Sequence, residues 1–262
     1  MSFIILGNQR SGTSYLLDLM NQHPLVDTIN EPFSMHLDFF RVDESKWSCE
    51  DYDESFLHAD LKALPQTQLF IQELDKWMNF EFSTVRGFKE TALFEKYGWL
   101  QKAIHFNHTI IIIRDFRAVI YSVLRRNLHL GWWNYEERLQ NFYHYSGPKN
   151  AHILCAEILK RRTNYLMDII HNNSCYILRL EDVMCNPIEE LERLMNYIGL
   201  EINEAQIRFL IETSSETRDS AYSNFRRKED VLDKWKNALG AKIVSDINSI
   251  LNDQINFFGY RL

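Results

Sequence analysis

The chain has 262 residues, of which 45% are hydrophobic and 25% charged, and its formal net charge is −7. This length suits one large α/β domain or two small ones, and the negative charge argues against binding nucleic acid through bulk electrostatics. Because the four cysteines form no C-x-x-C pair and no zinc spacing, we expect reduced thiols in a cytoplasmic protein. We expect neither a signal peptide nor an integral membrane segment, since no apolar run approaches about 18 residues.

Short apolar runs alternate with helical patterns along the chain. Four runs predict buried parallel strands, in which both faces are covered and the alternation of polar and apolar residues disappears: 3–6, 85–88, 109–113 and 175–178. Helical patterns occur at 14–21, 118–126, 151–171 and 188–198. The order predicts a central parallel sheet flanked by helices, with ligand sites beyond the carboxyl ends of the strands. Because there is no repeat or linker, we expect residues 1–262 to form a single α/β domain.

The stretch GNQRSGTS directly follows the first predicted strand. Its glycines have the spacing of the phosphate loop G-x-x-x-x-G-K-S/T, but Thr13 replaces the lysine that reaches the terminal phosphates of a triphosphate. Gly7 and Gly12 permit a tight turn, and the helix that follows offers unpaired N–H groups to an anion. Arg10 adds a guanidinium group suited to phosphate or sulfate oxygens. The loop fits a single 5′-phosphate, or one phosphate plus a second anion; a turn without a ligand is the alternative.

A second candidate site follows the strand predicted at 109–113. Arg114 stands at the carboxyl end of this strand, and Ser122 lies about two helical turns further along. Two separated donors beside one nucleotide site indicate a second phosphate far from the first. The alternative is an ion pair between Arg114 and a nearby carboxylate such as Asp115.

Four stretches, in chain order, resemble the sulfotransferases that use 3′-phosphoadenosine 5′-phosphosulfate (PAPS). FIILGNQRSGTSYLLDLMNQHP resembles their 5′-phosphosulfate loop, and IIIIRDFRAVIYSVLR resembles their 3′-phosphate element. YILRLEDVMCNPIEELERLMNYIGL is similar to their YEDL…P…L…LGL segment, with Leu180 in place of the usual tyrosine. FRRKEDVLDKWKNALG and the terminal FFGYRL resemble their C-terminal Arg/Lys element and closing Gly-Tyr. The resemblance implies a PAPS-dependent sulfotransferase with a phosphate-loop-like fold, closer to the carbohydrate and tyrosylprotein branch than to the cytosolic phenol and steroid type.

The resemblance also implies which residues bind the donor PAPS and its product PAP, the desulfonated nucleotide. These are Arg10, Ser11, Gly12, Thr13, Ser14, Tyr15, Arg114, Ser122, Arg227 and Lys228. The glycine that normally follows the Arg-Lys pair is Glu229 here. Since PAPS has no γ-phosphate, the missing loop lysine is not needed, and the resemblance implies chemistry without a metal.

Sulfonate transfer has two requirements: a positive group beside the leaving oxygen, and a base for the acceptor hydroxyl. Arg10 and Lys89, the latter in GFKET at the end of a predicted strand, are the candidates for leaving-group charge. Lys89 matches the lysine that follows a strand in many members of the family. A solvated strand end is the alternative for Lys89.

The base is a separate question, because the histidine that phenol- and steroid-type members carry two residues after that lysine is Thr91 here. Glu31, in HPLVDTINEPF, matches the glutamate of the carbohydrate and tyrosylprotein branch. Pro32 disfavours a helical conformation at Glu31, so we expect an extended loop that enters the cleft. His36 and Glu90 are further candidates, and a surface carboxylate is the alternative for Glu31.

Three functions remain open on the sequence. The first is transfer of sulfonate from PAPS to a hydroxyl of a carbohydrate, lipid or small metabolite, with residues 40–80 and 125–147 as possible acceptor-side insertions or, alternatively, packing elements. The second is nucleotide-dependent phosphoryl transfer, against which the missing lysine and a missing magnesium carboxylate count. The third is nucleotide binding without catalysis, although a protein that only binds has no need of Glu31 as a base.

Overall fold

Five parallel strands form the sheet in a computed structural model that describes residues 1–33, 65–80, 84–91, 93–126, 150–218 and 223–261. Their spatial order is β2 (Val26–Asn30), β3 (Val85–Glu90), β1 (Ser2–Leu6), β4 (His108–Ile113) and β5 (Cys175–Arg179). All neighbouring pairs are parallel. The predicted α/β class and all four predicted strands are therefore confirmed. Strand β2 was not predicted, because the polar residues Asp27, Thr28 and Asn30 interrupt its apolar residues.

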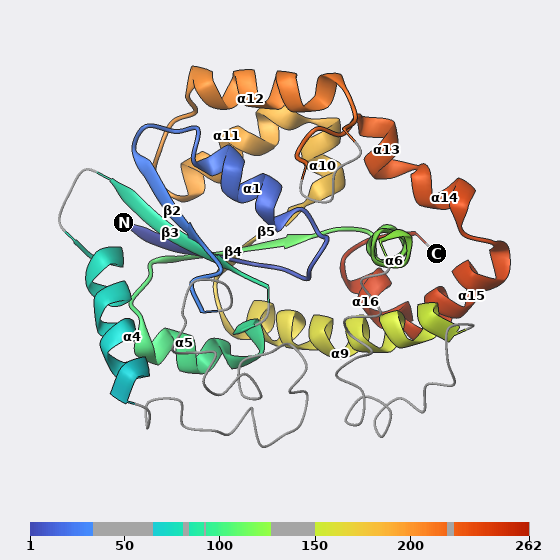
Figure 1. The fold of residues 1–262 in the computed structure, drawn as a ribbon, viewed down its shortest axis with the longest axis horizontal. Helices are drawn as coiled ribbons and strands as arrows, with labels where there is room; N and C mark the ends of the chain where they lie inside the picture. Colours follow the sequence, from blue (N-terminus) through green and yellow to red (C-terminus); the bar gives the residue numbers. More distant parts are fainter. Residues whose placement is uncertain (34–64, 81–83, 92, 127–149, 219–222, 262) are drawn as a thin grey trace.

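Two helical layers cover the sheet (Figure 1). On one face lie α1 (Thr13–Met20), α10 (Leu180–Cys185), α11 (Pro187–Tyr197) and α12 (Glu204–Ser215). On the other face lie α4 (Pro65–Met78), the 3-10 helix η3 (Leu93–Lys96), α5 (Tyr97–Ala103) and α9 (Ala151–Asn172). Alternate residues of β1 enter the two cores, Phe3 and Ile5 on the α1 side and Ile4 and Leu6 on the α9 side.

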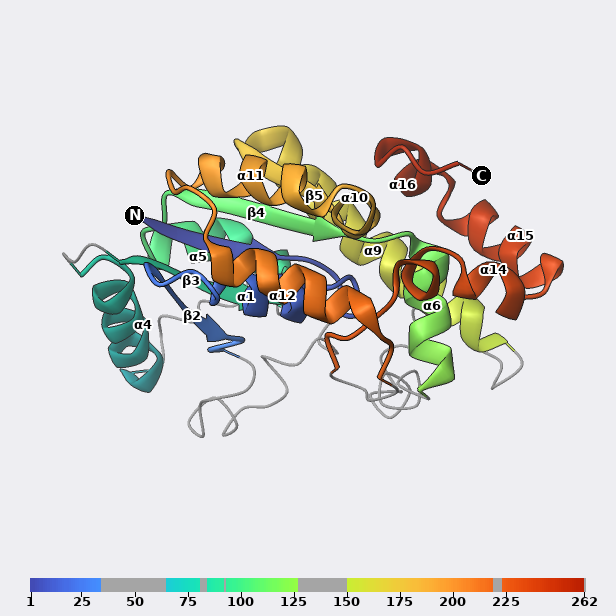
Figure 2. The same ribbon diagram turned by 90° about the horizontal axis from the view of Figure 1, so that it is seen from above.

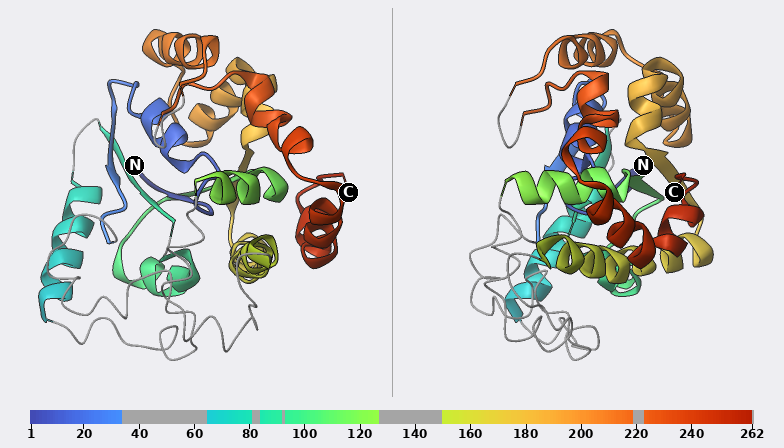
Figure 3. Two further views of the ribbon diagram at one scale, coloured as in Figure 1. Left: turned by 45° about the vertical axis from the view of Figure 1, so that its right-hand side comes forward. Right: turned by 90° about the vertical axis from the view of Figure 1, so that its right-hand side faces the viewer.

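A group of helices lies beyond the carboxyl ends of the strands (Figure 2). It comprises α6 (Phe116–Arg125), α13 (Lys228–Leu232), α14 (Lys234–Ala238), α15 (Ala241–Ile250) and α16 (Asn252–Phe257). Helix α14 contacts α6, and α15 and α16 return to contact α9 (Figure 3). The end of the chain therefore closes over the edge of the sheet where ligand sites are expected.

The helices predicted at 14–21, 118–126, 151–171 and 188–198 are confirmed as α1, α6, α9 and α11. Part of the segment 40–80 is α4, which buries Ile71, Leu74 and Met78 in the core and so packs as a helix. Residues 40–64 of that segment, and residues 127–147 of the second one, lie outside the described residues. Among the described helices, none combines the length and hydropathy needed to cross a membrane.

Two glycines shape the loop between β1 and α1. A Cβ atom on Gly7 would stand 2.5 Å from the carbonyl oxygen of Ile112 in the neighbouring strand β4. Gly12, the N-cap of α1, has a φ of 94°, and a Cβ there would meet Leu180 at 3.0 Å. Both positions thus exclude a side chain, and Gly12 also requires the left-handed region that favours glycine.

We expect Gly7→Ala to lower the free energy of unfolding by about 1 to 3 kcal/mol, because the added methyl group overpacks against the backbone of β4. Denaturant unfolding measures this change. Gly98→Ala is the matched control, since a Cβ on Gly98 in α5 meets nothing within 4 Å and alanine raises helix propensity by up to about 1 kcal/mol. Equal effects of the two substitutions would contradict the close approach at Gly7.

Candidate active site

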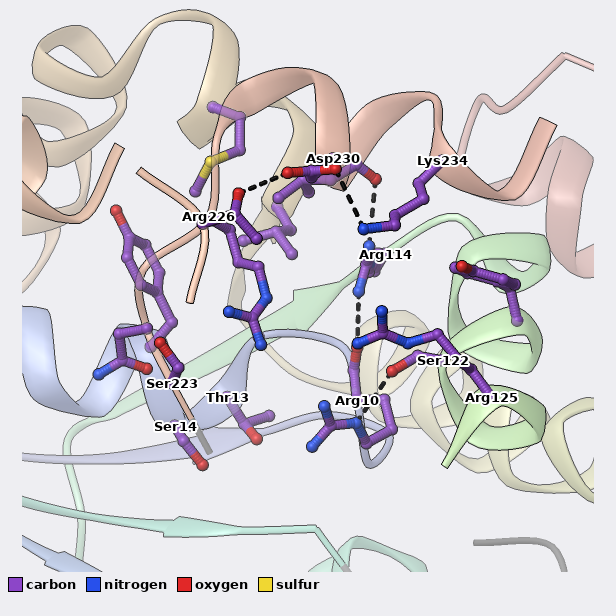
Figure 4. A pocket seen from close by; sticks show the side chains of 18 residues that line it. Arg10, Thr13, Ser14, Arg114, Ser122, Arg125, Ser223, Arg226, Asp230 and Lys234 are labelled. Carbon is purple, nitrogen blue, oxygen red and sulfur yellow. Dashed lines mark hydrogen bonds and ion pairs between the residues drawn. The ribbon is translucent and has the colours of Figure 1, made fainter. Parts of the chain in front are cut away.

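A cavity of about 160 Å³ opens at the carboxyl edge of the sheet, between the phosphate loop, α6, α10 and the C-terminal segment (Figure 4). Its lining comprises Arg10, Gly12, Thr13, Ser14, Tyr15, Arg114, Tyr121, Ser122, Arg125, Leu180, Met184, Thr217, Ser223, Asn224, Arg226, Asp230, Val231 and Lys234. Most of the predicted nucleotide-binding residues thus meet in one place. Ser11 is buried instead, 2% exposed, and does not line the cavity.

The lining is strongly basic although the chain as a whole is acidic. Its charged residues are Arg10, Arg114, Arg125, Arg226 and Lys234 against the single carboxylate of Asp230. Among the described residues of the lining, five cations minus one anion give a charge of +4, whereas the chain carries −7. A concave site lined by one sign of charge focuses the field and concentrates ligands of the opposite sign, so this cavity is suited to a polyanion.

Arg10 ties the phosphate loop to the elements beside it. Its Nε donates to the Oγ of Ser122 at 3.1 Å, and its carbonyl oxygen accepts from Nη1 of Arg114 at 3.4 Å. Arg114 and Ser122 therefore both contact Arg10. The loop, the end of β4 and helix α6 form one continuous wall of donors.

Arg114 is partly exposed and has few partners for a guanidinium group. Nη2 donates to the carbonyl oxygen of Val231 at 3.1 Å, and Nε has no partner among the described residues. Burial lowers the pKa of Arg114, an effect that the Glu181 carboxylate opposes. The alternative pairing with Asp115 is wrong, because Asp115 binds Arg117 at 2.8 Å and caps α6. Arg114 thus keeps donor capacity beside the cavity.

Glu31 and Lys89 form an ion pair next to the loop. Lys89, at the carboxyl end of β3, is 3% exposed, and its Nζ lies 2.8 Å from Oε1 of Glu31 and 3.4 Å from Oγ of Ser14. The hydroxyl of Thr91 donates to the same Oε1 at 2.7 Å. Since Ser14 also lines the cavity, this cluster adjoins the anion site.

The backbone at Glu31 is left-handed, with a φ of 44°, so the expected extended conformation is wrong. Glu31 directly follows β2, and its N–H donates to the carbonyl oxygen of Lys89 at 2.8 Å, which holds the chain in this turn. Within the described residues, the two non-glycine residues with positive φ are Arg10, at 70°, and Glu31. Such backbone costs about 1 to 3 kcal/mol and clusters at functional sites. Both residues are candidates for catalysis on independent grounds.

The remaining candidates lie elsewhere. Glu90 is fully buried, and its Oε1 accepts a hydrogen bond from the N–H of Phe33 at 3.0 Å. His36 lies outside the described residues. Arg227 and Lys228 line a separate hollow, which shares Tyr15 and Met184 with the cavity.

Three basic residues of the lining were missed by the sequence interpretation. Arg125 lies three residues after Ser122 on α6, a spacing that places both on one helix face and was a usable signal. Arg226 immediately precedes the predicted Arg-Lys pair, and Lys234 lies one helical turn after Asp230, with which it forms an ion pair at 3.3 Å. Neither of these two carried a signal of its own.

Among the described residues, no three His, Cys, Asp or Glu side chains gather in a way that could hold a metal ion.

Known sulfotransferases are similar to this chain in sequence and in fold. The family model described as "Sulfotransferase family" matches residues 2–204. A search of curated proteins gave no significant match. Solved structures share the fold at low identity. The sulfotransferase STF9 from Mycobacterium avium has a TM-score of 0.63 at 13% identity, covering 100% of this chain and 77% of that one.

Two further structures are similar over nearly their whole length. The sulfotransferase domain from the curacin biosynthetic pathway has a TM-score of 0.61 at 13% identity, with 99% of this chain and 98% of that one covered. Mouse sulfotransferase SULT7A1, solved in complex with PAP, has a TM-score of 0.54 at 10% identity, with 97% and 84% covered. At these identities the structures establish the fold, and the family model establishes the family. The chain belongs to the sulfotransferase family.

Proposed function

We propose that the protein transfers a sulfonate group from PAPS to a hydroxyl of a carbohydrate, lipid or small metabolite and releases PAP. The observation that carries this proposal is the basic cavity at the phosphate loop, with the Lys89–Glu31 pair beside it. Membership of the sulfotransferase family favours sulfonyl transfer over phosphoryl transfer. The PAP complex of mouse SULT7A1, which shares the fold, supports the choice of donor.

The charge of the cavity fits such a nucleotide. A terminal phosphate carries about −1.5 to −2 at neutral pH, and the phosphosulfate group adds two further acidic functions. The lining offers a charge of +4 to this polyanion. We assign the 5′-phosphosulfate to the loop, with Arg10, Thr13, Ser14 and the N-terminus of α1, and the 3′-phosphate to Arg114 and Ser122.

In the reaction the bond between sulfur and the phosphate oxygen breaks, and a bond between sulfur and the acceptor oxygen forms. Negative charge develops on the phosphate oxygen, which Arg10 and Lys89 stabilise as positive groups at the loop. The acceptor hydroxyl loses its proton to Glu31. Lys89 Nζ contacts both Ser14 in the loop and Glu31, so one cation joins the leaving-group side of the site to the base.

The test of this function is PAP formation from PAPS in the presence of glucose, N-acetylglucosamine, cholesterol or 1-decanol, which represent the acceptor classes. We expect PAP to form faster with at least one of them than with water alone. Absence of PAP formation by the folded protein under all these conditions would contradict the proposal.

Nucleotide binding tests the 3′-phosphate assignment. We expect PAP to bind far more tightly than AMP. We expect Arg114→Ala to weaken the binding of PAP by about 2 to 4 kcal/mol, since a charged hydrogen-bond partner is lost in a desolvated site. Calorimetry measures both affinities. Arg193→Ala is the control, because Arg193 is an exposed residue of α11 paired with Glu189 and Glu190. Equal binding of PAP and AMP to the wild type would make the assignment wrong.

Adjacent arginines allow a comparison of the cavity with the neighbouring hollow. We expect Arg226→Ala to weaken PAP binding by about tenfold or more, because Arg226 lines the cavity and a hydrogen bond to a charged group contributes about 1.5 to 3 kcal/mol. Arg227→Ala should change the affinity by less than about threefold, as expected for an exposed charge. The reverse order would support the residues that the sequence resemblance selected, Arg227 and Lys228.

Glu31→Gln tests the base. The substitution keeps the size and hydrogen bonding of the side chain but removes its basicity, so we expect kcat to fall by about 100-fold or more. Affinity for PAP should stay nearly unchanged, because the proposed nucleotide contacts lie on the loop and on Arg114. Single-turnover kinetics measure the loss in the chemical step itself, because product release often limits kcat.

Two other results would change the interpretation of Glu31. Near wild-type turnover would remove Glu31 as the base and make Glu90 and His36 the next residues to test. A parallel loss of PAP binding would mean that Glu31 maintains the shape of the loop instead.

A further inference from the structure

Thr91 occupies a position that no part of the proposed reaction uses directly. It follows β3 immediately, is 3% exposed, and donates its hydroxyl to Oε1 of Glu31 at 2.7 Å. Lys89 reaches the same Oε1 at 2.8 Å from two residues earlier. Because side chains two residues apart in extended chain point to the same side, one strand end supplies both donors.

These donors treat the two carboxylate oxygens of Glu31 differently. Oε1 accepts two hydrogen bonds, whereas Oε2 accepts none from the described residues. Lys89 alone would not maintain this asymmetry, since either carboxylate oxygen can accept a hydrogen bond from its compact, freely rotating ammonium group. A second donor with a fixed direction is needed to keep one particular oxygen turned away from the lysine.

Thr91 is itself fixed from the opposite side by helix α9. Its carbonyl oxygen accepts a hydrogen bond from Arg162, which is 2% exposed and whose guanidinium group lies 4.6 Å from the ring centre of Phe94. A buried cation is costly unless it is hydrogen-bonded and paired, so this side chain has little freedom to move. The Thr91 hydroxyl therefore extends from a backbone whose carbonyl oxygen is held by α9.

The same helix also holds the phosphate loop. Thr163, next to Arg162, accepts a hydrogen bond from Nδ2 of Asn8 at 3.1 Å, and both residues are buried. The carbonyl oxygen of Asn8 in turn accepts from the N–H of Ser11 at 3.1 Å. Two consecutive residues of α9 thus connect the anion-binding loop and the strand end that carries Thr91.

We propose that Thr91 is a positioning residue, whose hydroxyl fixes the Glu31 carboxylate so that Oε2 is presented to the proton of the acceptor hydroxyl. The inference rests on the proposed function, in which Glu31 is the base. Without the hydroxyl, the carboxylate can rotate and share both oxygens with Lys89, which competes with the acceptor for Oε2. Misplacing a reacting group by about 1 Å costs as much as 100-fold in rate.

The experiment compares Thr91→Val, which removes the hydroxyl and keeps the shape, with Thr91→Ser, which keeps the hydroxyl. It measures the single-turnover rate of PAP formation from PAPS, with the panel compound that the wild type sulfonates fastest, or with water. We expect Thr91→Val to lower this rate by about 10- to 100-fold with PAP affinity unchanged, and Thr91→Ser to restore most of it. If valine prevents folding, Thr91→Ala replaces it, because alanine and serine both lack the methyl group and differ by the hydroxyl.

Two controls separate positioning from a general effect on stability. Thr109→Val removes the hydroxyl of another buried threonine, which bonds Tyr97 at 2.6 Å near the start of β4, and should leave the rate unchanged. In the Glu31→Gln background, adding Thr91→Val should change the remaining rate by less than about twofold, because the hydroxyl acts through the carboxylate.

A wild-type rate for Thr91→Val, or the same loss with and without Glu31, would overturn the inference and leave Glu31 as the proposed base. Near wild-type turnover of Glu31→Gln would overturn both the base and its positioning residue. Absence of any PAP formation by the wild type would contradict the proposed function itself.

Discussion

The close contact between Gly7 and the carbonyl oxygen of Ile112 is the constraint on which the site depends. A Cβ at this position would stand 2.5 Å from that oxygen. Because Gly7 has no Cβ, the loop after β1 can lie directly on the end of β4. From there Arg10 reaches Ser122 on α6, and the carbonyl oxygen of Arg10 meets Arg114. Donors from the loop between β1 and α1 and from the segment that joins β4 to α6 thereby surround one cavity. It lies at the edge of the sheet where parallel α/β folds place their ligands.

Backbone strain accompanies this arrangement. Arg10 and Glu31 adopt positive φ without being glycine, and such conformations persist only where the surroundings over-determine them. At Glu31 the restraints are its own N–H bond to Lys89 and the two donors on Oε1. These restraints come from the neighbouring strand end, so the position of Glu31 depends on β3 as much as on its own strand.

The sequence predicted strands where apolar residues run together. Strands β1, β4 and β5 were readable because their apolar runs are continuous, and β3 carries a shorter pattern of this kind, whereas Asp27, Thr28 and Asn30 interrupt β2. The loop, Arg114 and Ser122 were readable from local spacing. The approach of Arg226 and Lys234 to the loop depends on how the C-terminal helices close over the sheet, which no local pattern encodes. The left-handed turn at Glu31 likewise results from its bond to Lys89, a partner 58 residues away that local propensity does not include.

The distribution of charge explains how an acidic protein can hold an anionic ligand. Asp230 is the single carboxylate among the described residues of the lining. It accepts a hydrogen bond from the Thr217 hydroxyl and forms an ion pair with Lys234. The Thr217 hydroxyl is the main cause that lowers the pKa of Asp230, with Lys234 acting in the same direction, so this carboxylate stays ionised at neutral pH. Its negative charge is compensated by neighbours in the C-terminal segment, Lys234 and Arg226. Among the described residues, cations thus outnumber carboxylates in the lining, although the chain as a whole is acidic.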